Sequence, residues 1–132
     1  MKEITSANPL IKSLLTYATL PNKVDEEYQL YLMSPKRRLY GFELNGELVG
    51  CIGVEVINSI ECVLKHIAVS PNHRNTGIGT KMLNNISNIF PFVTAETDKD
   101  AVGFYSKYGF KILSLGEKYP GVERFKCVYR NY

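Results

Sequence analysis

The sequence predicts a mixed α/β fold (α+β in some classification schemes), in which helices cover both faces of one sheet. A strand, an amphipathic helix and a further strand follow one another between Val63 and Thr97. Parallel strands joined in this way need a right-handed crossover. An antiparallel meander precedes them, because Asn45-Gly46 between two apolar runs is a strong hairpin signal. At 132 residues the chain is long enough for one core and too short for two, so residues 1–132 are expected to form a single domain.

Two helices are predicted first. Asn8-Pro9 suits a helix start, and apolar residues then recur at the spacing of a packed helix face: Ile11, Leu14, Leu15 and Ala18. Leu20-Pro21-Asn22 ends this helix. A second helix is predicted from Val24 to Leu32, with three acidic residues near its positive end, and Met33-Ser34-Pro35 stops it.

Three strands are predicted next. The first, Leu39 to Leu44, meets the Asn45-Gly46 turn. The second, Leu48 to Ile57, is apolar until Glu55, as expected of a central strand covered on both faces. The third is Ile60 to Val69.

The second half of the chain alternates helices and strands. The predicted elements are a helix (Thr76 to Ile89), a strand (Phe92 to Thr97), a short helix capped by Asp98 or Asp100, a strand (Phe110 to Leu115), a loop (Gly116 to Gly121) and a last strand. In the last strand Phe125, Cys127 and Tyr129 alternate with more polar residues, which predicts one buried face.

Composition restricts the class of protein. With 45% hydrophobic and 22% charged residues, the chain has the balance of a soluble globular protein. No apolar run reaches the ~20 residues of a membrane span, and Met1 to Thr5 lacks the apolar core of a secretory signal. The three cysteines form no Cys-x-x-Cys pair, so we expect reduced core cysteines, a cytoplasmic location and no metal site.

The net charge of +3 does not indicate a nucleic-acid partner, which would require a longer basic stripe. Its densest part is Lys36-Arg37-Arg38. We interpret this run as a solvated connection or as cations near an anionic cofactor.

The most informative segment is Arg74-x-x-Gly77-x-Gly79, which directly follows a strand and opens a helix. A glycine-loosened turn at a helix start directs backbone N–H groups and the positive end of the helix dipole at one point, which suits a phosphate. The spacing excludes a nucleotide-triphosphate loop. It also excludes a dinucleotide fingerprint, because Met82 stands where the third glycine would be.

A second motif lies between Asp98 and Phe110. Its residues Ala101, Tyr105, Gly109 and Phe110 match the pattern Asn-x-x-Ala-x-x-x-Tyr-x-x-x-Gly-Phe, with Asp98 in the Asn place. In this order and with these strands between them, the two motifs resemble the GCN5-related N-acetyltransferase (GNAT) family. The resemblance covers residues 39–110 well and implies a mostly antiparallel mixed sheet. One further departure is Asn75, where the family usually has Gly; Asn tolerates left-handed backbone angles.

The resemblance implies that acetyl-CoA is the cosubstrate and that its acetyl group moves to a primary amine of a small molecule or peptide. The diphosphate would lie over the loop amides, and the pantetheine arm would pair with the fourth strand. The cofactor-binding residues implied are Ile67, Ala68, Val69, Arg74, Asn75, Thr76, Gly77, Ile78, Gly79, Thr80, Asp98 and Tyr105. A backbone N–H near Ala68 or Val69 would serve as the oxyanion donor.

Two catalytic side chains follow from the resemblance. Tyr105 occupies the family's place for a hydrogen-bond donor to the departing thiolate, with pure packing as the alternative. Some relatives carry a Glu base in the fourth strand at the position of Val63, and Glu61 is two residues earlier on the same strand face. Glu55, His66 and water-relayed deprotonation are alternatives.

Two other functions stay open. One is a catalytically weak acetyl-CoA-binding module with a regulatory or protein-binding role. The other is a protein that uses a helix-end anion site for a different ligand. The sequence determines neither the acceptor nor the oligomeric state, so a homodimer is also open.

Overall fold

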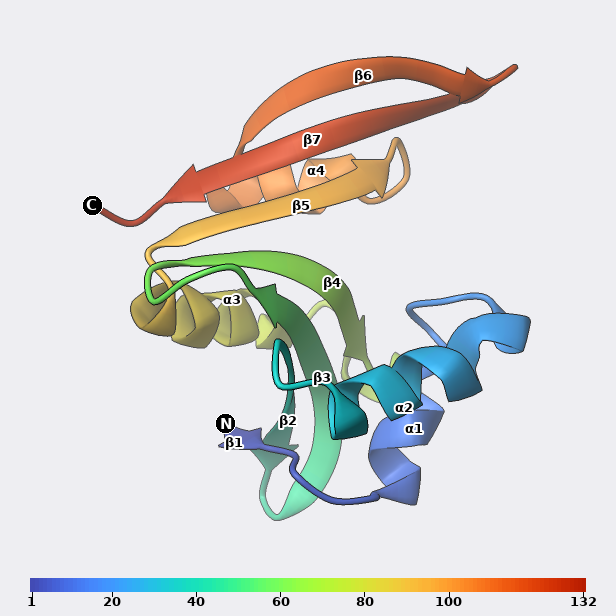
Figure 1. Ribbon diagram of the computed structural model, residues 1–132, viewed down its shortest axis with the longest axis vertical. Helices are drawn as coiled ribbons and strands as arrows, with labels where there is room; N and C mark the ends of the chain where they lie inside the picture. The colour runs from blue at the N-terminus through green and yellow to red at the C-terminus, as the bar shows by residue number, and fades with distance from the viewer.

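Seven strands form one sheet in the order β1-β2-β3-β4-β5-β7-β6 in the computed structural model, which describes residues 1–132 (Figure 1). The strands are β1 (Lys2–Glu3), β2 (Arg37–Leu44), β3 (Glu47–Val56), β4 (Glu61–Val69), β5 (Phe92–Asp98), β6 (Lys111–Tyr119) and β7 (Val122–Arg130). The helices are α1 (Pro9–Leu15), α2 (Val24–Met33), α3 (Ile78–Ile89) and α4 (Val102–Tyr108), with 3-10 turns η1 (Pro21–Lys23) and η2 (Pro71–His73). Only β4 and β5 pair in parallel, which confirms the predicted mixed, mostly antiparallel sheet.

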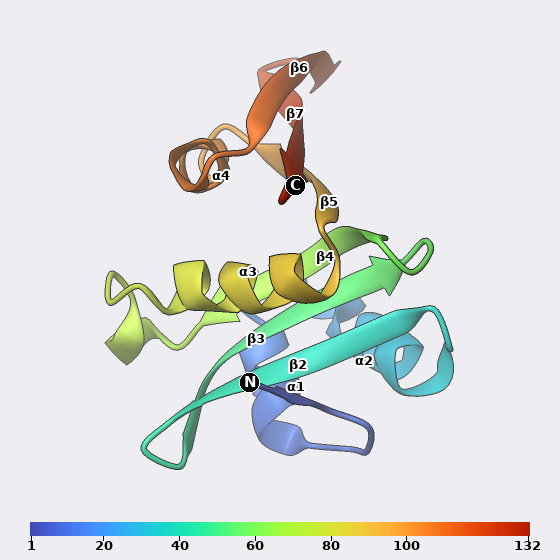
Figure 2. The same cartoon turned by 90° about the vertical axis from the view of Figure 1, so that its left-hand side faces the viewer.

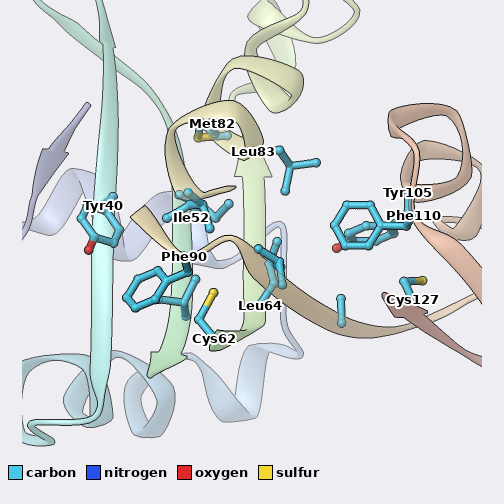
Figure 3. Close-up of a cluster of buried hydrophobic side chains, with 14 of the residues drawn as sticks. Tyr40, Ile52, Cys62, Leu64, Met82, Leu83, Phe90, Tyr105, Phe110 and Cys127 are labelled. Atoms are coloured by element: carbon cyan, nitrogen blue, oxygen red, sulfur yellow. The ribbon is translucent and has the colours of Figure 1, made fainter. Parts of the chain in front are cut away.

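Helices cover both faces of the sheet, as predicted. Figure 2 shows α3 on one side of β3 and β4, and α1 and α2 on the other. The side toward α3 and α4 holds a cluster of 16 buried residues, part of which Figure 3 shows, whereas a second cluster of 10 residues lies under α1 and α2. Cys51, Cys62 and Cys127 are all free and buried, which confirms their assignment to the core. The end of β4 and the start of α3 are left to form a site.

The predicted boundaries differ from the structure where the backbone is irregular. The predicted loop from Gly116 to Gly121 is mostly strand, because β6 continues to Tyr119 through a register shift that accommodates Gly116 at φ 80°. Helix α3 begins at Ile78 rather than Thr76. The two-residue strand β1 was not predicted, since it is too short to show alternation.

Helix α3 offers a matched test of core packing. Ile86 is fully buried in the cluster toward α3, whereas Ile89, one turn on, is 43% exposed. We expect Ile86→Ala to lower the free energy of unfolding by about 2–5 kcal/mol, because it leaves a cavity. Ile89→Ala should cost less than about 1 kcal/mol. Urea denaturation followed by circular dichroism measures both, and equal losses would contradict this packing.

Candidate functional site

A groove of about 1380 Å³ opens where β4 ends, between the β4–α3 loop, α3 and α4. All the predicted cofactor-binding residues line it except Thr76 and Tyr105. Those that do are Ile67, Ala68, Val69, Arg74, Asn75, Gly77, Ile78, Gly79, Thr80 and Asp98. The structure therefore brings the two sequence motifs together across one groove.

The loop between β4 and α3 presents a run of unused backbone donors. Asn75 and Gly77 have φ angles of 62° and 84°, which confirms that Asn75 adopts the left-handed conformation. The first helical hydrogen bond from this end runs from the N–H of Lys81 to the carbonyl of Gly77, at 3.0 Å. None of the N–H groups of residues 74–80 donates to an acceptor within the protein. They form an anion-binding concavity at the positive end of α3.

Side chains of the same loop fix its shape. The Nε of Arg74 donates to the carbonyl of Val69 at 3.1 Å, and its guanidinium lies 5.1 Å from the ring centroid of Tyr17. The hydroxyl of Thr76 donates to the carbonyl of His73, so Thr76 turns into the loop and not toward the groove. His73 lines the groove, and its buried Nδ1 has no hydrogen-bond partner. The loop is thus held by its own side chains, while its backbone N–H groups are left without partners.

Strands β4 and β5 separate beside this loop. They pair in parallel only as far as Leu64 and Ala95. Residues 65–69 of β4 therefore have β3 on one side and no strand on the other. The opening between the two strands, called here the β4–β5 split, continues the groove into the sheet.

Two residues of β4 turn their backbone groups toward the split. Ser70 donates its N–H to the carbonyl of Val49 at 2.7 Å, so alternate residues of β4 bond to β3 in this antiparallel ladder. By that alternation Ala68 bonds to β3, whereas Ile67 and Val69 direct N–H and C=O groups away from it. The predicted oxyanion donors were the N–H groups of Ala68 and Val69, and only that of Val69 faces the split. The N–H group of Ile67 also faces the split.

Helix α4 forms the opposite wall. A Cβ at Gly79 would lie 3.1 Å from the Phe104 ring, so the glycine lets that ring approach α3 closely. A Cβ at Gly77 would meet nothing within 4 Å, so its positive φ explains the glycine there. Tyr108 donates its hydroxyl to Oδ1 of Asn84 at 2.7 Å. Both residues line the groove, yet neither was predicted as a site residue.

Tyr105 lies behind the groove wall. It is 5% exposed and packs edge-on against Phe104 and Phe110. Burial raises the pKa of its phenol, so the group stays protonated and can only donate. Figure 3 shows its hydroxyl pointing away from α4, to the side where Leu64 of β4 lies. Since β4 and β5 separate after Leu64, the hydroxyl is directed toward the inner end of the split.

Asp98 accepts backbone hydrogen bonds in the turn that precedes α4. One carboxylate oxygen accepts the N–H groups of Asp100 and Ala101 at 3.0 and 3.1 Å. The N-cap of α4 is Ala101, which makes no side-chain cap hydrogen bond, so the prediction that Asp98 or Asp100 caps this helix is wrong, and Asp98 instead closes the turn before it. An anion is suited to this position, because a carboxylate accepts hydrogen bonds from the two backbone amides of the turn.

Glu61 is remote from the groove. It is the first residue of β4 and pairs with Phe92, whereas the groove begins at Ile67, about 20 Å further along an extended strand. A β-bulge between Leu64 and His66 also intervenes. We therefore assign Glu61 no catalytic role.

The cationic run also differs from its interpretation. Arg37 is not solvated, since its side chain is only 12% exposed and lies 3.4 Å from carboxylate oxygens of both Glu27 and Glu55.

None of the helices is long and apolar enough to cross a bilayer. No group of three or more His, Cys, Asp or Glu side chains is arranged to hold a metal ion.

Comparison with known proteins defines the class. Residues 35–112 match a family model described as the acetyltransferase (GNAT) domain. The chain belongs to this family of acetyltransferases.

Individual relatives agree with this assignment. Over 85 residues the chain is 29% identical to an uncharacterized N-acetyltransferase from the lysA 3′ region of Bacillus methanolicus, covering 64% of this chain and 71% of that protein. A GNAT family acetyltransferase from Elizabethkingia anophelis, solved with acetyl-CoA bound, superposes with a TM-score of 0.76 at 21% identity, covering 97% and 95% of the two chains. An aminoglycoside 6′-N-acetyltransferase from Enterococcus faecium gives 0.77 at 22% identity, covering 99% and 96%. These two structures are similar to this chain in fold.

Proposed function

We propose that residues 1–132 act as one N-acetyltransferase domain, which transfers an acetyl group from acetyl-CoA to a primary amine of a small molecule or peptide. The single observation that supports this most strongly is the run of free N–H groups at residues 74–80, at the mouth of a groove lined by both family motifs. Membership of the family supplies the reaction class.

Two features of the groove support binding of coenzyme A. Unpaired amides at the positive end of α3 suit a diphosphate, and each charge-assisted hydrogen bond is worth ~1.5–3 kcal/mol. The free edge of β4 offers the N–H and C=O groups of Ile67 and Val69 to an amide-bearing arm.

Bound acetyl-CoA would supply an activated acyl thioester. The chain's own contribution is to polarise and orient it. In this proposal the N–H groups of Val69 and Ile67 stabilise negative charge on a carbonyl oxygen in the split. Tyr105 donates a hydrogen bond to a sulfur that gains negative charge. Because burial raises the pKa of Tyr105, hydrogen bonding is favoured over complete proton transfer.

Calorimetry and turnover test this proposal separately. Calorimetric titration with coenzyme A should give a micromolar dissociation constant, as several charge-assisted bonds less the cost of association predict. Thiol release from acetyl-CoA should then rise when an amine is added from a panel of an aminoglycoside, a polyamine, an amino-acid amide and peptides with a free N-terminus or a lysine. Binding without turnover for any amine would instead support the acetyl-CoA-binding module, and no binding would exclude both.

A further inference from the structure

One residue that lines the groove comes from the N-terminal helices. Tyr17 directly follows the C-cap of α1, whereas every other lining residue lies between Ile67 and Tyr129. The family model matches residues 35–112, so Tyr17 also lies outside the part of the chain that the family match covers. A role for this tyrosine has to come from its own contacts.

The backbone of Tyr17 is anchored to the core. Its N–H group donates to the carbonyl of Leu14 at 3.1 Å, and Leu14 is buried in the cluster under α1 and α2. The side chain points the other way and is 55% exposed. Tyr17 therefore presents its ring to the groove from a fixed turn.

The ring of Tyr17 packs on the guanidinium of Arg74. The central carbon of the guanidinium lies 5.1 Å from the ring centroid, within the range of a cation–π interaction. The Nε of Arg74 also donates to the carbonyl of Val69 at 3.1 Å. Because one contact holds a face of the guanidinium and the other holds its edge, the two together fix its orientation. The hydroxyl of Tyr17 makes no hydrogen bond within the protein, so the ring alone makes this contact.

The bond to Val69 places the guanidinium at the entrance to the β4–β5 split. Val69 directs its carbonyl away from β3, because the next residue, Ser70, is the one that bonds to β3. Arg74 therefore lies between the free loop amides and the split. A ligand that binds the loop amides and extends into the split has to pass this guanidinium.

Most of the donors of Arg74 are unused. A guanidinium has five N–H donors, and only the Nε–H group of Arg74 bonds within the protein. Arg74 also takes part in none of the ion pairs of the chain. The N–H groups of both Nη atoms are thus left for a ligand, and a guanidinium suits the oxygens of a phosphate.

We propose that Tyr17 is a positioning residue for the cosubstrate, which holds the Arg74 guanidinium at the entrance to the split so that its Nη groups bind the diphosphate of coenzyme A. This inference rests on the proposed function. Tyr17 acts through Arg74, because a guanidinium that is already oriented loses less side-chain freedom when the phosphate binds. The effect is on affinity alone, so it should appear in the KM for acetyl-CoA and leave kcat unchanged.

Calorimetric titration with coenzyme A tests the role of the ring. Tyr17→Leu should weaken binding by about 2- to 10-fold, as expected when one long side chain has to be ordered on binding. Tyr17→Phe keeps the ring and should bind within about 1.5-fold of the unaltered protein. Tyr119 of β6 is 68% exposed and lies outside the groove, so Tyr119→Leu is the matched control and should leave the affinity unchanged.

A double-mutant cycle tests whether Tyr17 acts through Arg74. Arg74→Met removes the guanidinium and keeps an unbranched side chain, so it should weaken coenzyme A binding by itself. In the Arg74→Met background, Tyr17→Leu should cause no further loss. An equal loss from Tyr17→Leu in both backgrounds would show that the tyrosine acts independently of Arg74 and would overturn the proposal.

Nuclear magnetic resonance gives a readout without cofactor. Arg74→Met identifies the ¹H–¹⁵N signal of the Arg74 Nε–H group by its absence. Exchange of this proton with water should be faster in Tyr17→Leu than in the unaltered protein and unchanged in Tyr17→Phe. Equal exchange in all three would show that the ring does not hold the guanidinium, which contradicts the positioning role.

The two proposals fail in different ways. Equal affinity for coenzyme A in Tyr17→Leu and in the unaltered protein would overturn the positioning role alone. No binding of coenzyme A by the unaltered protein would overturn the proposed function and the positioning role with it.

Discussion

Gly77→Asp is expected to weaken coenzyme A binding strongly, whereas Gly77→Asn should weaken it much less. The two side chains have the same shape, and a Cβ at this position meets no atom within 4 Å. Both variants must adopt the φ of 84°, which Asn and Asp tolerate better than most residues. The difference between them is one negative charge beside the amides that we propose hold the diphosphate.

The size of that difference follows from electrostatics. Two charges about 6 Å apart at a protein surface interact by roughly 1–3 kcal/mol, or about 5- to 150-fold in the dissociation constant. Calorimetric titration of both variants with coenzyme A measures it, and raising the salt concentration should reduce it. Equal affinities for the Asp and Asn variants would show that the diphosphate does not bind at the start of α3. Circular dichroism of both confirms that α3 has formed.

The groove could be predicted from sequence because its parts are local. Arg74, Gly77 and Gly79 lie within six residues, and the turn that they form needs only backbone conformations that Asn and Gly tolerate. The structure confirms that turn and its free amides. The close approach of Phe104 to Gly79 could not be predicted, because it depends on how α4 packs against α3.

The contact between Tyr31 and His66 could not be predicted in the same way. Tyr31 and His66 are 35 residues apart, and their contact needs both the packing of α2 and the bulge at Lys65. A bulge moves every later side chain to the other face of the sheet. The alternation of faces along the strand therefore cannot be followed from Glu61 to the site. Arg37 was misread for a related reason, since a run of three cations does not reveal that one of them meets two carboxylates from α2 and β3.

Tyr105→Phe is expected to lower kcat by roughly 10- to 100-fold while leaving coenzyme A affinity within about twofold. The substitution removes only a hydroxyl that makes no hydrogen bond within the protein, so the edge-on packing against Phe104 and Phe110 should persist. If that hydroxyl stabilises the departing thiolate, its removal destabilises the transition state. The expected loss in kcat is then at the lower end of the range for general acid–base catalysis. A lower kcat with unchanged binding is the signature of such a group.

Tyr40→Phe is the matched control for this variant. Tyr40 lies in the same buried cluster but on β2, away from the groove, and should lose little kcat. Burial raises the pKa of Tyr105, so its phenol is protonated throughout the range from pH 6 to 9. The ratio of wild-type to Tyr105→Phe rates should therefore be constant across that range. Unchanged kcat, or a loss that appears only at high pH, would show that Tyr105 serves packing and not the leaving sulfur.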